Sequence, residues 1–371
     1  MFSDVVKTAE MIIIKRDADI LKMLSLKIRD PIFSISLIPF YSLFCNEVEI
    51  YFSKNNQPLN LKEYNSSKFS FKDIRQKAKF FDYKSAQKTF EMLRQIDNLN
   101  NTYFINRMRY PENGRWNVHD NIGIFFDEQG NVISNSHYGF YIFQNKKLLS
   151  KALKFDPELL QNEVKEFAKF VGSVIGSLTK GFSTVSDFIP CAIEPDIPTF
   201  FCKDFNTNRM RYNRDDRHSE KLIRLFLLHI LCGINFALYG LKKAITHDPG
   251  WLLRVEYVTY YHATKELRKL ITNSSNSVAQ SEILKEITLE EDKYYDSDFR
   301  GCMMHYGLWS RSSKSYLEEK YCDYSLPLCG LVESMFEGIS YWNFQNIIEE
   351  RLLAMSHSIS RYLDLDLAIS E

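Results

Sequence analysis

The C-terminal part of the chain carries apolar residues at a spacing that fits an α-helix. Between Ser340 and Leu363 they lie near one face, formed by Phe344, Ile347, Ile348, Leu352, Met355, Ile359 and Leu363. A repeat of three and four residues lines up side chains along one stripe of a helix and would scatter them over both faces of a strand. We therefore predict a long helix with one buried face.

Similar patterns precede this segment. Helices are predicted from His218 to Ile245 and from Trp251 to Leu270, with a break at Pro249 and Gly250. Shorter helices are expected at 280–287 and 294–308. Because the connections are short, neighbouring helices should pack antiparallel. We expect residues 151–371 to form a C-terminal helical bundle with its core from about residue 216.

The N-terminal half mixes helix and strand signals. Residues 1–30 predict a helix that stops near Pro31, whereas 33–52 suits helix or strand. Apolar residues alternate over 122–126, turn-forming residues occupy 127–131, and a further strand is predicted at 138–143. The predicted fold is mainly α, with a small antiparallel β-hairpin or meander in an N-terminal region of residues 1–150.

Charge and cysteine usage narrow the class of protein. The 47 basic residues balance the 47 acidic residues, so any nucleic acid must be held by a local patch. The seven cysteines form no Cys-x-x-Cys pair, which indicates reduced cytosolic thiols. The apolar runs Pro31 to Phe44 and Leu225 to Leu241 are shorter than the roughly 20 residues of a membrane span. We expect a cytoplasmic protein without a membrane partner.

The stretch DSDFRGCMMHYGL, from Asp296 to Leu308, carries the candidate chemistry. Arg300 can hold a phosphate in a bidentate fork, and His305 can move a proton near neutral pH. Five residues apart on a helix, they lie roughly 140° apart around its axis. They would converge if Arg300 lay at the helix N-terminus, whose dipole would add to a phosphate site.

This stretch resembles the HEPN family of all-helical nuclease domains over roughly residues 216–371. The family signature is an arginine, four to six residues and a histidine, and here Tyr306 and Gly307 follow the histidine. The resemblance implies a homodimer in which Arg300 and His305 of both protomers line one cleft and cleave RNA without a metal. It also implies a toxin–antitoxin or phage-defence system, with an antitoxin or other regulatory protein as partner.

Other interpretations of the same residues stay open. The family often has a polar residue where Gly301 stands, and Arg300 and His305 could instead form an internal ion pair with Asp296 or Asp298. Three further arginine–histidine pairs have a similar spacing but lack this context, namely Arg211/His218, Arg224/His229 and Arg351/His357. The alternative function is a non-catalytic helical scaffold that binds a nucleotide or a protein.

A repeated pentamer provides candidate substrate-binding residues. The sequence NRMRY occurs at 106–110 and again at 208–212, and supplies Arg107, Arg109, Arg209 and Arg211. Arginine beside tyrosine can clamp phosphates and stack on bases. Tyr306 is added to this substrate-binding set, and Asp296 and Asp298 are expected to support the catalytic pair. The alternative for the pentamers is a solvated, charge-paired loop.

Histidines near the predicted hairpin lack the spacing of a metal site. His119 and His137 flank it with Asp120 and Asp127 nearby, but a metal needs at least three convergent ligands. The chain also lacks a glycine-rich phosphate loop. We therefore expect neither a metal nor a cofactor.

Overall fold

The computed structural model describes residues 2–56, 59, 74–80, 86–107, 121–143, 165, 168–169, 171–178, 192–193, 200–207, 219–247, 250–273, 292–310 and 312–363. Its elements are α1 (Phe2–Lys27), α2 (Pro31–Lys54), η1 (Gln76–Lys79), α4 (Ala86–Arg107), β1 (Ile122–Phe126), β2 (Val132–Asn135), α5 (Ser136–Phe143), β3 (Ala192–Ile193), β4 (Phe201–Phe205), α8 (Ser219–Asn235), η2 (Phe236–Leu241), α9 (Lys242–Ala244), β5 (Ile245–His247), α10 (Trp251–Asn273), α13 (Ser297–Met304), η3 (Glu319–Tyr321), η4 (Pro327–Gly330), α14 (Leu331–Met335) and α15 (Tyr341–Leu363). The predicted fold class, mainly α with a small antiparallel sheet, is confirmed.

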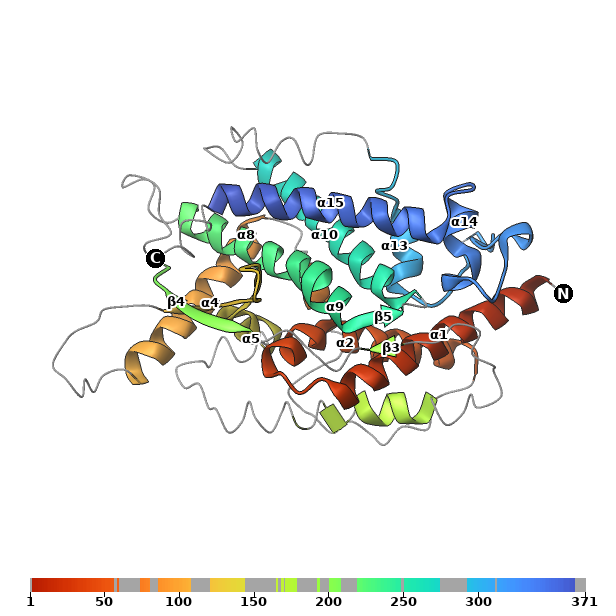
Figure 1. Ribbon diagram of the computed structural model, residues 1–371, viewed down its shortest axis with the longest axis horizontal. Helices are drawn as coiled ribbons and strands as arrows, with labels where there is room; N and C mark the ends of the chain where they lie inside the picture. Colours follow the sequence, from red (N-terminus) through yellow and green to blue (C-terminus); the bar gives the residue numbers. More distant parts are fainter. Residues whose placement is uncertain are drawn as a thin grey trace.

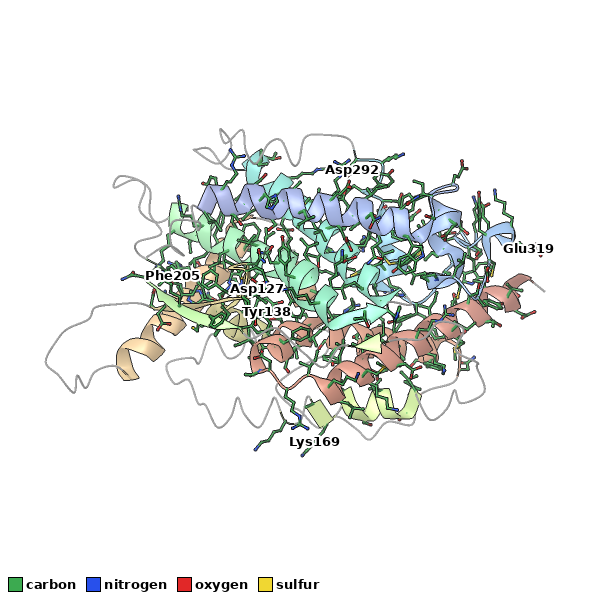
Figure 2. All side chains as sticks on the ribbon, viewed as in Figure 1. Asp127, Tyr138, Lys169, Phe205, Asp292 and Glu319 are labelled. Carbon is green, nitrogen blue, oxygen red and sulfur yellow. The ribbon has the colours of Figure 1, made fainter. Side chains whose placement is uncertain are left out.

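The long helices form the body of the molecule. Figure 1 shows α15 along one side and α1 along the opposite side, with α8 and α10 between them. Leu352 and Ile359 on α15 are fully buried, as the apolar stripe predicts. In Figure 2, Asp292 lies beside α15. Its carboxylate accepts from the Tyr260 hydroxyl at 2.6 Å and forms an ion pair with Arg351 Nε at 3.2 Å. This carboxylate ties α10 and α15 to the segment that leads into α13.

Helix α2 shows why residues 33–52 were ambiguous. They are apolar on nearly every side and buried on nearly every side, so periodicity is weak. The helix is fixed instead at its start, where the Asp30 carboxylate accepts from Phe33 N at 2.8 Å and Pro31 occupies the first turn.

Within the described ranges, two helical stretches have the length and apolar composition to cross a membrane, Pro31–Lys54 and Lys221–Ala244. Within the protein, 78% and 83% of these windows are buried against other elements. That burial is the pattern of a core helix.

The small sheet has the strand order β2-β1-β4, and both pairings are antiparallel. The predicted turn forms around Asp127, whose Oδ1 accepts from Gln129 N at 3.0 Å and Asn131 N at 2.8 Å. The strand predicted at 138–143 is wrong, because these residues belong to helix α5. Asn135 Oδ1 accepts from Tyr138 N at 3.1 Å and caps that helix.

Two predicted helices have different bounds. The helix predicted for 218–245 runs through α8, a π-helical segment over Phe236–Leu241 and α9, and then becomes strand β5. The one predicted for 294–308 is limited to Ser297–Met304, so His305 lies outside it. The predicted helix at 280–287 falls outside the described residues.

The buried residues form one cluster that draws on both sides of position 150. Strand β1 pairs with β4, and the buried Arg254 Nε on α10 lies 2.9 Å from Asp17 Oδ2 on α1. The N-terminal helices therefore build part of the surroundings of α13.

Candidate functional site

A solvent-accessible cleft of about 1030 Å³ lies where α1 and α2 face α13 and the segment that follows it. Ionisable side chains that line it include Lys7, Glu47, Lys54, Asp298, Arg300 and His305. The predicted catalytic pair thus shares one cleft. The N-terminal half supplies the opposite wall, although the sequence resemblance was confined to the C-terminal half.

The N-terminus of α13 is closed by its own cap. Asp296 Oδ1 accepts from Asp298 N at 2.8 Å and from Phe299 N at 2.6 Å. These amides cannot also bind an external anion, so the expected phosphate site at the helix tip is absent here. Asp296 therefore acts as a helix cap, and Asp298 is exposed at the cleft.

Arg300 lies in the first turns of α13, and its side chain meets an aromatic ring. The guanidinium carbon is 5.2 Å from the centre of the Tyr261 ring, which is cation–π distance. Among the described residues, no carboxylate forms a salt bridge with Arg300, and its buried Nε has no hydrogen-bond partner. The alternative in which Asp296 or Asp298 neutralises Arg300 is not found in this structure.

His305 reaches the cleft by leaving the helix. It is the C-cap of α13 with extended backbone (φ −132°, ψ 159°), and its N–H donates to Gly301 O at 2.9 Å. Its ring turns toward α2, where Nδ1 lies 2.5 Å from Glu47 Oε2. Its side chain is 50% exposed. The expectation that Arg300 and His305 both lie in the first turns of a helix is therefore wrong.

Glu47 lines the cleft beside His305, although its sequence context did not single it out. It is 3% exposed on α2, where its Oε1 accepts from Asn46 Nδ2 at 2.9 Å and forms an ion pair with the Arg75 guanidinium. Its other oxygen meets His305. A buried carboxylate needs such partners, because burial without them is costly. In the sequence, Glu47 is one of two acidic residues, with Glu49, in a mostly apolar helix.

The electrostatics of the site keep His305 neutral. Burial, and then the positive charges of Arg75, Lys79, Arg300 and Lys54, lower the pKa of His305 to about 4. The negative charge of Glu47 would favour the imidazolium form of His305, but the positive charge of Arg75, which pairs with Glu47, offsets this effect. A neutral imidazole beside a carboxylate must carry its proton on Nδ1, because a carboxylate only accepts. Nε2 then has a free lone pair and can act as a base.

A buried network supports the C-terminal turn of α13. Arg254 Nη1 donates to Cys302 O at 2.9 Å and Met303 O at 2.7 Å, immediately before His305. Tyr306 is 4% exposed, and its hydroxyl donates to Asp17 Oδ2 at 2.7 Å. Tyr306, predicted to bind substrate, thus lines the cleft with its hydroxyl bonded to Asp17.

Glu10 on α1 fixes the next residues of the wall. Its Oε1 accepts from Leu308 N at 2.7 Å and its Oε2 from the Tyr51 hydroxyl at 2.8 Å. Burial raises the pKa of Glu10, and these two donors oppose that effect. The chain from His305 to Leu308 is thus held from both sides.

The predicted basic pentamers fall almost entirely outside the described residues. Arg109, Arg209 and Arg211 lie outside the described residues, and Arg107 ends α4 with a side chain that is not described. Of the other pairs, His229 is buried in the core and stacks on His137 at 6.5 Å. No group of three His, Cys, Asp or Glu side chains suited to a metal ion occurs in the described part of the chain.

Comparison of the chain with models of protein families, with curated proteins and with solved structures gives no match. The functional argument therefore rests on the cleft.

Proposed function

We propose that the protein is an endoribonuclease of HEPN type that cleaves single-stranded RNA in this cleft. The observation that carries the proposal is the shared opening of Arg300 and His305 onto one cleft, with His305 oriented by Glu47. Arg300 has no carboxylate partner among the described residues. Its charge is thus left to meet an anion.

The proposed reaction uses the 2′-hydroxyl of RNA as the nucleophile. Arg300 binds the non-bridging oxygens of the phosphate and stabilises the charge that grows on them. His305 Nε2 removes the 2′-hydroxyl proton while O2′ bonds to phosphorus and the bond from phosphorus to O5′ breaks. The imidazolium then returns this proton to O5′, which leaves a 2′,3′-cyclic phosphate.

Substrate charge would bring His305 closer to the pKa that this cycle needs. A phosphate near Arg300 adds negative charge beside the ring and favours the imidazolium. The pKa of His305 then rises from about 4 toward neutrality. A base poised near the working pH transfers protons in both directions most effectively.

Aromatic side chains support a single-stranded substrate. Tyr51, Trp309 and Tyr316 line the same cleft as Arg300 and are half-buried. Bases that are free of pairing can stack on such rings, and each stacked base contributes roughly 1–3 kcal/mol. A duplex keeps its bases stacked on one another.

The resemblance supports further proposals about the setting. The protein would work in the cytoplasm as a homodimer, with the second protomer adding its own Arg300 and His305 to the cleft. Its role would be in phage defence or a toxin–antitoxin system, under the control of a regulatory protein.

The test is cleavage of a labelled single-stranded RNA panel in the presence of EDTA. We expect cleavage by the wild type and losses of about 10²–10⁴-fold in His305→Ala and in Arg300→Ala. His357→Ala is the control, because His357 is exposed on α15 and also follows an arginine at similar spacing. RNA binding without cleavage by the wild type would refute the nuclease and favour the scaffold.

A further inference from the structure

We propose that Glu47 is a positioning residue that holds His305 in its Nδ1–H tautomer, with Nε2 turned to the cleft. The inference deepens the proposed function, because it assigns the group that prepares the base. The position of the His305 ring proton can be measured without any substrate.

The two oxygens of Glu47 have different partners. Oε1 forms an ion pair with the Arg75 guanidinium and accepts from Asn46 Nδ2, and neither of these groups can accept a hydrogen bond. Oε2 faces His305 Nδ1 at 2.5 Å. The groups on Oε1 fix the orientation of the carboxylate. Oε2 can only accept a hydrogen bond, so the proton between Oε2 and His305 must be on Nδ1.

Three separate segments build this arrangement. Glu47 and Asn46 come from α2, Arg75 precedes η1, and His305 ends α13. Glu47 is 3% exposed, whereas the His305 side chain is 50% exposed. The carboxylate is therefore in the protein interior and the imidazole is at its boundary with the cleft, which is the placement expected of an orienting group behind a base.

The substitution Glu47→Gln should invert the tautomer. The new amide has one acceptor and one donor end, and Arg75 and Asn46 can be satisfied only by the oxygen. The NH₂ group must then face His305 and donate to Nδ1. The ring proton moves to Nε2, and the lone pair that faced the cleft is lost although the shape of the site is kept.

Glu10→Gln is the matched control. Glu10 is also a buried carboxylate on the cleft, and it also receives two hydrogen bonds, from Leu308 N and the Tyr51 hydroxyl. Its two hydrogen bonds therefore go to other groups than His305. The tautomer of His305 should be unchanged in this variant.

The experiment is ¹⁵N NMR of the full chain labelled at histidine, at pH 7.5, with His305 assigned from the spectrum of His305→Gln. We expect a protonated Nδ1 in the wild type and in Glu47→Gln a protonated Nε2. A protonated Nε2 in the wild type would overturn the inference even if the variant failed to fold. So would a retained Nδ1–H in folded Glu47→Gln.

Activity then separates this inference from the proposed function. RNA cleavage by Glu47→Gln should fall by about 10²–10⁴-fold, mainly in kcat, as in other enzymes whose histidine takes the wrong tautomer. A tautomer that inverts in Glu47→Gln while no variant or wild type cleaves RNA would support the positioning role and refute the nuclease. Cleavage that depends on His305 with an unchanged rate in Glu47→Gln would refute the positioning role alone.

Discussion

Loss of the Asp17 charge should destabilise the whole protein, because Asp17 neutralises a cation in its core. Arg254 is 4% exposed and Asp17 is 1% exposed, and Nε lies 2.9 Å from Oδ2. Asp17→Asn keeps the side-chain shape but leaves the guanidinium without its counter-charge. Removal of one member of a buried ion pair costs about 3–5 kcal/mol. The same carboxylate accepts from Tyr306, so a second contact weakens too.

This cost converts to a shift in melting temperature. An unfolding entropy of about 2.1 cal/mol/K per residue gives about 0.8 kcal/mol/K for 371 residues. Dividing the cost of about 3–5 kcal/mol by this entropy gives a decrease in Tm of about 4–6 °C. The assay is thermal unfolding followed by circular dichroism. Asp19→Asn is the control, because its side chain is 31% exposed in an i,i+4 pair, and such pairs contribute about 0.3–0.5 kcal/mol. A Tm for Asp17→Asn within 1 °C of the wild type would refute the reasoning.

Three further predictions concern pH and backbone. The pKa of His305 is lowered to about 4, and the neutral ring is the proposed base. The value of kcat/KM for RNA should therefore fall below about pH 4 and stay level from pH 6 to 8. A fall centred near pH 6.5 would contradict this prediction. Burial, and then Lys221, lower the pKa of His137 from 6.5 to about 3, so the unfolded chain binds a proton there that the folded chain does not. Stability should therefore fall as pH drops from about 6.5 toward 3, and Tm measured across this range should fall less steeply in His137→Phe. Gly301→Ala should raise the free energy of unfolding by about 1 kcal/mol, because a Cβ there meets nothing within 4 Å. Gly330→Ala should lower the free energy of unfolding, because φ is +82° and the Cβ would overlap the Tyr321 carbonyl. Urea titration of both variants measures the two changes.

The sequence predicted those features whose cause is local. The stripe on α15, the stop before Pro31 and the turn at Asp127 each follow from residues close together in the chain. The prediction of a strand at 138–143 failed because these residues form helix α5, which Asn135 caps.

The site could be predicted only in part, because its geometry comes from distant segments. Arg300 and His305 share a cleft, but the end of α13 brings His305 there and the helical spacing does not. Glu47 and Arg75 lie more than 200 residues earlier, and nothing near them in sequence indicates a histidine partner. Only the folded core places α2 against the end of α13.

The chemistry of the RNA product ends tests the central claim most directly. Single-stranded RNA would be incubated with the wild type in EDTA and H₂¹⁸O, and the fragments analysed by mass spectrometry. If Arg300 and His305 direct attack by the 2′-hydroxyl, the initial 5′ fragment ends in a 2′,3′-cyclic phosphate without ¹⁸O, and the 3′ fragment begins with a 5′-hydroxyl. A 5′-phosphate that contains ¹⁸O, or RNA that stays intact, would contradict the account.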